Sequence, residues 1–365
     1  MKIVIFGLTV TSSWGNGHAT LWRGLCRALA RQGHRIVFFE RDVPYYAGNR
    51  DLWQLAGTDI VLYGDWDGIV WRARLELADA DAAIVTSYCP DGIAAGDLVQ
   101  EATRGLKVFY DLDTPVTLSR LSRGESLSYI GTRGLAAYDL VLSFTGGAAL
   151  GELQDRLGAR CVAPLYGHVD PDTHRPVASN ETYRADLSYL GTYATDRQAA
   201  LDALFVQPAR QRPQQRFVMA GAQYPQDFPW TGNLFFVRHL PPSEHPAFFS
   251  SSRLTLNVTR EAMAVMGWCP SGRLFEAAAC GSALITDDWA GLETFFTPGQ
   301  EIFVARGTAD VVAALDQDDA SIARTAKAAR DRTLAEHTSE RRAGDLIAAF
   351  ENARSPARAR QRIEA

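Results

Sequence analysis

The N-terminal half of the chain alternates short apolar runs with longer stretches rich in Ala, Leu and Arg. Ile3–Phe6 predicts a strand, Ala19–Gln32 a helix and Arg35–Glu40 a second strand, with Gly33 where the glycine that ends a helix belongs. Continuous apolar strands separated by helices indicate a parallel sheet covered on both faces. The same pattern predicts further strands at Ile60–Tyr63, Ala82–Thr86, Lys107–Asp111, Leu140–Phe144 and Cys161–Pro164.

A polar, turn-rich segment follows Tyr166 and then a second α/β series begins. We therefore predict an α/β protein with two doubly wound domains and a cleft between them: residues 1–168, a linker over 169–184, residues 185–340, and a helical tail over 341–365. The second series predicts strands at Leu187–Gly191, Arg216–Ala220, Leu234–Val237, Leu254–Asn257, Ala283–Thr286 and Glu301–Val304, with helices over Arg197–Leu204, Leu274–Cys280 and from Ile322 onward.

Composition narrows the function classes. The 365 residues carry 37 Lys and Arg against 42 Asp and Glu, a net charge of −5, so the chain has no overall basic field to attract nucleic acid. Its five cysteines show no CxxC spacing, which argues against a disulfide framework or a structural zinc site and favours a reducing cytoplasm. No apolar run is long enough to span a membrane, and the apolar start predicts a buried strand.

The first segment with candidate chemistry is the loop Thr9–Thr20, TVTSSWGNGHAT, at the predicted carboxyl end of the sheet. Gly15 and Gly17 let backbone N–H groups approach an anion, and the next helix N-terminus adds partial positive charge. Asn16 and His18 place polar side chains at the same point.

Dinucleotide binding is an alternative, because Glu40 ends the second strand where an acid grips the ribose in such enzymes. The glycine pattern is incomplete, however, since Thr20 stands where the third glycine belongs. We favour Glu40 as a polar strand end paired with Arg41 or Arg50.

The second segment is Asn257–Gly281, where Pro-Ser-Gly precedes a predicted helix. Ser271 is a candidate N-cap whose neighbouring N–H groups can hold a phosphate. Arg273 lies in the first turn, where the helix dipole disfavours a cation unless an anion binds beside it. Glu276 lies in an apolar stretch, so its carboxylate needs a partner, either ribose hydroxyls or an ion pair with Arg273 or Arg260.

These residues carry a resemblance. The stretch RLFEAAACGSALITDDWAGLETFFTPGQEI resembles the donor-binding region of GT-B glycosyltransferases of the group 1 (GT4-like) superfamily. Together with SSWGNGHAT, FFERD, FYDLDTPVTL, LSFTGG and LNVTREAM it is similar to the CgeB-like branch. The resemblance implies two Rossmann-like domains of GT-B fold, with a nucleotide-diphosphate sugar held mainly by the C-terminal one, an acceptor by the N-terminal one, and the last helix crossing back to the first domain.

The resemblance also implies residue roles on the donor side. Glu276 falls on the glutamate that binds the nucleotide ribose, and Arg238, His239 and Leu240 fall on the segment that reads the nucleobase. One position departs from the family pattern: Trp268 stands eight residues before Glu276, where a second acid contacts the sugar, so the sugar and the stereochemistry stay open. The remaining donor-side candidates are Gly15, Asn16, Gly17, Gly191, Thr192, Arg197, Asn257, Thr259, Arg260, Ser271, Gly272, Arg273 and Leu274.

Candidate bases lie in the N-terminal half. His18 has a near-neutral pKa suited to proton transfer, or it simply caps its helix. Asp113 holds the acceptor hydroxyl, orients His18 or forms an Asx turn. The DLD sequence resembles a metal motif of another fold, but no histidine clusters with it, so we predict no metal. The acceptor side is predicted to comprise Asp111, Thr114, Thr145, Gly146 and Gly147.

We therefore predict a cytoplasmic, metal-independent glycosyltransferase that needs no cofactor. Its partners are a nucleotide-sugar donor, UDP-linked in the first instance, and a small-molecule or glycan acceptor. The alternatives are a nucleotide-sugar epimerase or hydrolase on the same fold, a nucleotide-sugar-binding protein without catalysis, and an oxidoreductase.

Overall fold

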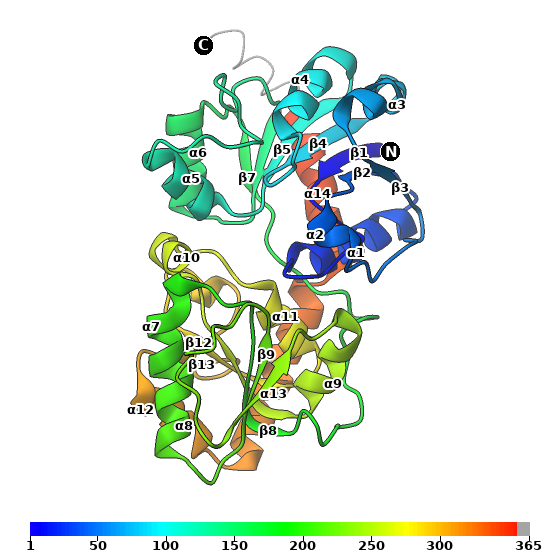
Figure 1. Ribbon diagram of the computed structural model, residues 1–365. Helices are drawn as coiled ribbons and strands as arrows, with labels where there is room; N and C mark the ends of the chain where they lie inside the picture. The colour runs from blue at the N-terminus through cyan, green and yellow to red at the C-terminus, as the bar shows by residue number, and fades with distance from the viewer. Residues whose placement is uncertain (356–365) are drawn as a thin grey trace. The chain divides into compact units, whose positions relative to one another are not determined.

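The computed structural model describes residues 1–355 and divides the chain into two compact units (Figure 1). The first comprises Met1–Tyr166 together with the helix that begins at Ser339, and the second comprises Gly167–Thr338. The segment 169–184, expected to be a linker, therefore lies within the second unit. Hydrogen bonds explain this: the backbone N–H groups of Val177 and Asn180 donate to the hydroxyls of Ser250 and Ser251.

The first unit contains a seven-stranded parallel sheet in the order β3-β2-β1-β4-β5-β6-β7. The strand order reverses between β1 and β4, so the loops after these strands diverge there, which is where α/β sheets bind ligands. The strands are β1 (Lys2–Gly7), β2 (Arg35–Arg41), β3 (Thr58–Tyr63), β4 (Ala82–Thr86), β5 (Leu106–Asp111), β6 (Leu140–Ser143) and β7 (Val162–Pro164). The helices are α1 (His18–Arg31), α2 (Pro44–Ala47), α3 (Trp66–Ala78), α4 (Gly92–Ala102), α5 (Thr114–Ser122) and α6 (Ala148–Leu157).

The second unit contains a six-stranded parallel sheet in the order β10-β9-β8-β11-β12-β13, which reverses between β8 and β11. Its strands are β8 (Ala185–Leu190), β9 (Phe217–Gly221), β10 (Leu234–Arg238), β11 (Ser252–Asn257), β12 (Ala283–Asp287) and β13 (Phe303–Ala305). Its α-helices are α7 (Gln198–Leu201), α8 (Gln207–Gln211), α9 (His245–Ser250), α10 (Glu261–Met266), α11 (Gly272–Ala279), α12 (Thr308–Leu315) and α13 (Asp319–Glu336).

The predicted helix Arg197–Leu204 is longer and irregular. It starts with a 3₁₀ turn (Thr195–Arg197) and continues through α7, a π-helical turn (Asp202–Val206) and α8. Pro208 at the start of α8 lacks the N–H that a regular helix needs and its ring crowds the preceding turn, so the wider π turn fits the chain around it.

The predicted helical tail forms two helices. Helix α13 belongs to the second unit, whereas α14 (Ser339–Arg354) belongs to the first and packs against α1. Ala343, Leu346 and Phe350 of α14 are fully buried. Residues 356–365 lie outside the described residues.

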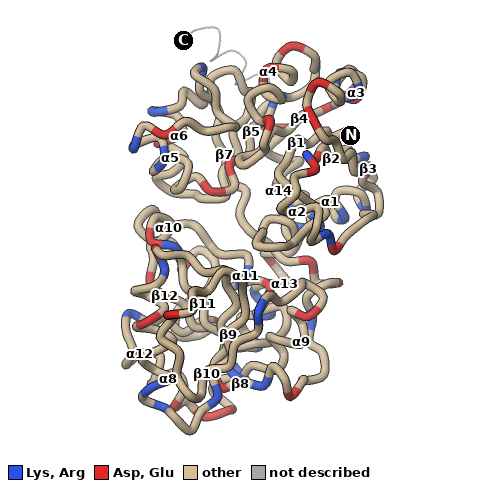
Figure 2. Tube along the Cα trace, viewed as in Figure 1, with Lys and Arg blue, Asp and Glu red and all other residues tan. Residues whose placement is uncertain are grey.

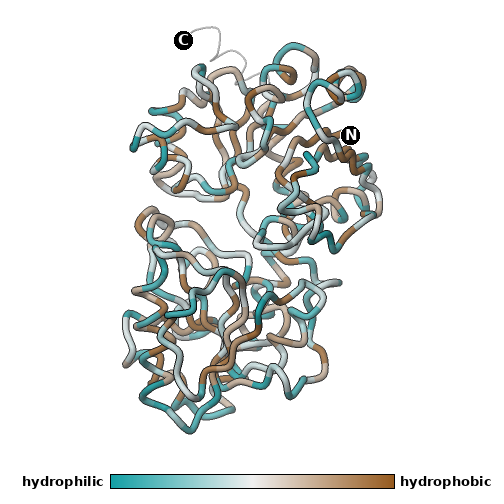
Figure 3. The backbone as a smooth tube through the Cα atoms, in the orientation of Figure 1, coloured by the Kyte–Doolittle hydropathy of each residue, from teal (hydrophilic) through white to brown (hydrophobic). Residues whose placement is uncertain are grey.

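Each sheet forms the centre of its own core. Apolar residues follow the central strands of both sheets, as the brown segments of Figure 3 show. Acidic and basic residues are interspersed along both units (Figure 2). All five cysteines are buried free thiols. Within residues 1–355, no helix combines the length and apolar character that crossing a bilayer requires.

Candidate functional site

The second unit gathers arginines where its strand order reverses. Asp196 follows β8 and Arg260 follows β11, and the Arg260 Nε lies 3.0 Å from Asp196 Oδ2. Arg197 Nη1 donates to the carbonyl oxygen of Thr192 at 3.3 Å. The predicted phosphate ligand Arg260 thus already has an acidic partner, which links the two diverging loops.

Helix α11 begins at the same edge. Ser271 is its N-cap, as predicted, and its Oγ accepts from the backbone N–H of Arg273 at 3.4 Å. Gly272 is the first helical residue, and the side chain of Leu274 is buried. The N-terminal N–H groups of the helix therefore face the same loop region as the arginines.

Arg273 and Arg197 form a cationic pair in this region. Burial lowers the pKa of Arg273; the charge of Glu276 opposes this effect, and that of Arg197 adds to it. The Nε atoms of both arginines are buried and have no hydrogen-bond partner among the described residues. Two like charges held together beside a helix N-terminus are the arrangement that an anion stabilises.

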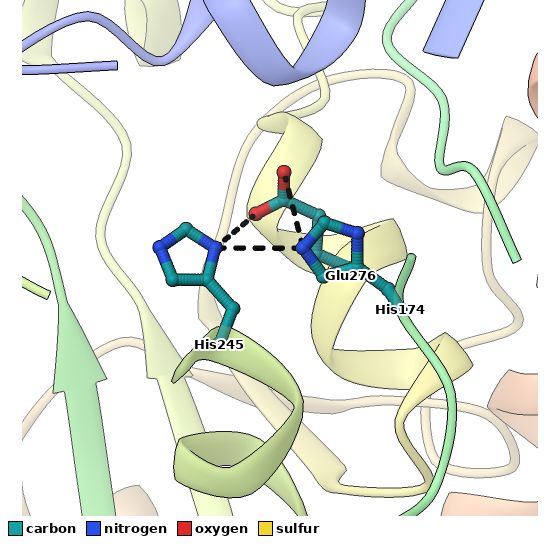
Figure 4. Close-up of side chains that lie close together, drawn as sticks. All are labelled: His174, His245 and Glu276. Atoms are coloured by element: carbon teal, nitrogen blue, oxygen red, sulfur yellow. Dashed lines mark hydrogen bonds and ion pairs between the residues drawn. The ribbon is translucent and has the colours of Figure 1, made fainter. Parts of the chain in front are cut away.

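Glu276 lies one turn into α11, where its side chain is buried. Two histidines face it: His174 Nε2 is 3.9 Å from Oε1 and His245 Nδ1 is 3.8 Å from Oε2 (Figure 4). Of the two arginines expected to pair with Glu276, Arg273 feels its charge, and Arg260 forms an ion pair with Asp196.

Other predicted donor-side residues hold the fold together. The Asn257 amide donates to the hydroxyls of Thr259 and Thr286, and Thr259 donates to Asp287 through both its N–H and its hydroxyl. These bonds join the ends of β11 and β12. Asn257 and Thr259 therefore have a structural role, because they connect the two strand ends.

The backbone of the nucleobase-reading segment is also engaged. The N–H of His239 donates to the carbonyl of Gly221, and the carbonyl of Leu240 faces His245 Nε2 at 3.3 Å. The N–H of Gly191 donates to Ala220. Arg238 at the end of β10 is exposed.

Trp268, at the position of the family acid, has an unusual backbone with φ of +44°. Its N–H donates to the carbonyl of Ala290, and its ring lies so close to Gly291 that a Cβ there would be 2.5 Å from ring atoms. The indole therefore takes a packing role in the loop before α11.

An aromatic cluster that the sequence reasoning missed follows β8 and β9. The rings of Tyr193 and Tyr224 are 5.6 Å apart, and Tyr224 also contacts Phe228, Trp230 and Phe236. The Tyr224 hydroxyl donates to the carbonyl of Gly191. These aromatic residues are spread between positions 193 and 236, so no local sequence pattern indicated that the folded sheet would bring them together.

In the first unit, Glu40 organises the loop after β1. Its buried carboxylate accepts from the hydroxyls of Thr9 and Thr11 at 2.6 and 2.5 Å and from the N–H groups of Val10 and Thr11. The expected pairing with Arg41 or Arg50 is wrong: those arginines pair with Asp91 and Asp42. With its oxygens occupied by the loop, Glu40 does not have the role of a ribose ligand.

The loop that Glu40 fixes leads into α1. Asn16 is buried, and its side chain donates to the carbonyls of Thr9 and Ser12 and accepts from the N–H of His18. Asn16 therefore shapes the loop, whereas Gly15 and Gly17 are exposed.

His18 begins α1 beside the point where the first sheet reverses. Its ring is 6.2 Å from that of Tyr88, which follows β4 and donates its hydroxyl to Asp113 Oδ2 at 2.9 Å. Burial lowers the pKa of His18, while the charge of Asp113 raises it. His18, Tyr88 and Asp113 thus form one cluster, and Tyr88 is a member that sequence reasoning missed; its φ of +63° is strained.

Asp111 lies beneath this cluster and is fully buried. Its Oδ1 accepts from the N–H of Asp113 and the hydroxyl of Thr117, and its Oδ2 has no hydrogen-bond partner among the described residues. Burial raises its pKa to about 6. The Asx turn belongs to Asp111, and Asp113 is the carboxylate bonded to Tyr88.

The remaining acceptor-side candidates are held by Ser143. The hydroxyl of buried Thr114 is 2.7 Å from that of Ser143, and the Thr145 N–H donates to the same oxygen. Gly146 faces the hydroxyl of Tyr166 closely, and Gly147 caps α6.

A comparison with sequence families adds one match. Residues 197–348 match the family model Glyco_trans_1_2, described as "Glycosyl transferase-like". No curated protein matches the chain.

Solved structures resemble the whole chain. A sucrose-phosphate synthase from Thermosynechococcus elongatus is 14% identical with a TM-score of 0.72, covering 96% of this chain and 98% of its own. HepE from Anabaena, in complex with UDP and glucose, is 10% identical with a TM-score of 0.70, covering 96% and 100%. An alpha-glucosyltransferase in complex with UDP and DNA is 12% identical with a TM-score of 0.68, covering 96% and 99%. The chain therefore has the two-domain GT-B fold, and its residues 197–348 match a glycosyltransferase-like family.

Proposed function

We propose that this protein transfers a glycosyl group from a nucleotide diphosphate donor, UDP-linked in the first instance, to a hydroxyl acceptor. The arginine pair Arg197 and Arg273 at the N-terminus of α11 carries the proposal, because it places two positive charges, each with a buried Nε that has no hydrogen-bond partner among the described residues, where a diphosphate leaving group can bind. The UDP complexes of HepE and of the alpha-glucosyltransferase support UDP as the nucleotide.

In this proposal the donor binds to the second unit. The arginines and the first N–H groups of α11 stabilise the negative charge that develops on the diphosphate as the bond to the sugar breaks, so no catalytic metal is required. Glu276 accepts hydrogen bonds from the ribose hydroxyls, and the aromatic cluster around Tyr224 lies beside the loops that face the base. Five free thiols fit a reducing compartment, the cytoplasm.

The acceptor binds to the first unit in the same proposal. His18 takes the proton of the acceptor hydroxyl as that oxygen attacks the sugar, with Asp113 holding the acceptor or stabilising the imidazolium that forms. The lowered pKa of His18 keeps the imidazole neutral, as a base must be, at neutral pH.

The donor site is tested by calorimetry with UDP. Arg273→Gln and Arg197→Gln are each expected to weaken UDP binding by about 1.5–3 kcal/mol, the range for hydrogen bonds to charged groups. Arg184→Gln is the control, because this exposed arginine precedes β8, at the edge of the sheet opposite the loops that follow the strands, and pairs with Glu181. Equal UDP affinity in all three variants contradicts the donor site.

Catalysis is tested by product analysis. His18→Ala is expected to abolish transfer while leaving UDP affinity unchanged, since His18 belongs to the other unit. Release of free sugar from the donor alone, undiminished by this substitution, would favour a nucleotide-sugar hydrolase instead. UDP binding without turnover of any donor would favour a binding protein.

A further inference from the structure

Three ionisable side chains converge in the second unit from segments far apart in the sequence. His174 comes from the segment before β8, His245 is the first residue of α9, and Glu276 lies in α11. Figure 4 shows the two imidazoles and the carboxylate pointing toward one another. Their exposed fractions are 3%, 8% and 6%, so a charged carboxylate and two rings share an interior site.

One hydrogen bond between the imidazoles and two longer contacts to the carboxylate join the three side chains. His174 Nε2 is 3.4 Å from His245 Nδ1, and the two nitrogen–oxygen distances of 3.8 and 3.9 Å exceed hydrogen-bond range. Ligands at about 2.0–2.2 Å from one tetrahedral Zn²⁺ lie roughly 3.3–3.6 Å from each other. One donor atom from each residue lies within 4.8 Å of the others, so the side chains would draw together around an ion.

The outer contact of His245 fixes its tautomer. Its Nε2 lies 3.3 Å from the carbonyl oxygen of Leu240, which can only accept, so Nε2 carries the proton and Nδ1 presents a lone pair to the cluster. A metal-bound histidine typically donates its second N–H in this way.

His174 completes an electron-rich centre. Its Nε2 faces the His245 lone pair and the Glu276 carboxylate, and its Nδ1 has no hydrogen-bond partner among the described residues. A cation at the centre offsets the repulsion between carboxylate oxygen and imidazole lone pair.

We propose that His174, His245 and Glu276 bind a divalent transition-metal ion, with Zn²⁺ as the first candidate. Imidazole and carboxylate ligands suit zinc, and the ion would tie the segment before β8 to α9 and α11. Neither the DLD sequence nor any of the cysteines contributes to this site. The metal site does not depend on the proposed transfer, although Glu276 takes part in both.

The test is metal binding by the full-length protein after treatment with a chelator. Titration with Zn²⁺ and Co²⁺ is expected to show one equivalent bound per chain, with visible Co²⁺ absorption bands. His245→Asn and Glu276→Gln are expected to weaken binding by roughly tenfold or more. His337→Asn is the matched control, because His337 is equally buried and its Nε2 faces the carbonyl of Phe295 at 3.3 Å.

Absence of saturable binding, or equal binding by wild type and His245→Asn, overturns the proposal. If the variants do not fold, X-ray absorption of the zinc-loaded wild type decides: a shell with two imidazoles supports the site, and a shell without them overturns it. UDP calorimetry on the metal-free protein separates the two proposals. UDP binding by a protein that binds no metal supports the proposed transferase and contradicts the metal site. Metal binding by a protein that does not bind UDP supports the metal site and contradicts the proposed transferase.

Discussion

Two buried glutamates show that the tertiary contacts of a residue determine its role. Glu40 and Glu276 both follow or interrupt apolar runs, and each has a sequence context that fits a ribose ligand. In the structure Glu40 is surrounded by donors from Thr9, Val10 and Thr11, whereas Glu276 faces two neutral imidazoles at 3.8–3.9 Å. Glu40 is thereby satisfied by its own loop, whereas Glu276 lies among side chains from two other segments of the chain.

The first prediction concerns Glu40. Glu40→Ala is expected to lower the free energy of unfolding by about 3 kcal/mol, because it leaves buried hydroxyl and N–H donors without an acceptor. Urea denaturation measures this change. Glu181→Ala is the control, because the Glu181 side chain is 83% exposed. A loss below about 0.5 kcal/mol would mean that the loop finds other acceptors.

The second prediction concerns pH and Asp111. Its folded pKa of about 6 lies above the ordinary value of 3.8, so between these pH values the folded state binds more protons than the unfolded state. The stability that Asp111 contributes is therefore complete below about pH 4 and falls as the pH rises through 6.

Asp111→Asn removes this titration. The difference in free energy of unfolding, variant minus wild type, is expected to increase between pH 4 and pH 7 by an amount on the order of 2–3 kcal/mol. Urea denaturation across this range measures it. Parallel pH profiles for the two proteins would contradict the raised pKa.

At the scale of elements, both candidate sites arise where the strand order of a sheet reverses. The loops after β1 and β4 bring His18 beside Tyr88, and those after β8 and β11 bring Asp196 to Arg260. The sequence predicted the strands and therefore the loops, since apolar runs of this length are typical of buried parallel strands. It missed Tyr88, Asp196 and the two histidines. Which loops meet depends on strand order, and local sequence patterns do not specify strand order.

The third prediction concerns the end of β9. Gly221 has a φ of +154°, and a Cβ there would lie 1.9 Å from the carbonyl oxygen of Gly191, so only glycine lets the two loops meet. Gly221→Ala is expected to cost about 2–4 kcal/mol and to weaken UDP binding, because it displaces the loop that precedes Arg197. Thermal unfolding and calorimetry measure the two effects.

Gly232→Ala provides the control for this substitution, since nothing lies within 4 Å of its added Cβ. Equal thermal stability and equal UDP affinity of the two variants would show that the loop after β8 accommodates the added Cβ at Gly221.

At the scale of the whole molecule, the chain forms two units with separate cores. The first unit is completed only by α14, which follows the second unit in the sequence and packs on α1. Each unit should therefore respond separately to changes confined to its own core or its own ligand.

The fourth prediction tests this independence by calorimetric unfolding. Phe350→Ala in α14 is expected to lower the free energy of unfolding of the first unit by about 3–5 kcal/mol, the cost of truncating a fully buried Phe. UDP at a hundredfold excess over its Kd is expected to stabilise only the second unit, by about 2.7 kcal/mol. A single transition moved by both changes would show that the units unfold as one.

The sequence by itself determined the α/β architecture, the position of each strand in the described residues and the N-cap of α11 at Ser271, because hydrophobic periodicity and helix capping are local properties of the chain. Only the tertiary structure decided what each polar residue contacts. It assigned Glu40 to its loop, Arg260 to Asp196, and Glu276 to histidines 102 and 31 positions away. A buried charge takes whichever partner the fold brings within a few ångströms, and that choice depends on distance in space rather than along the chain.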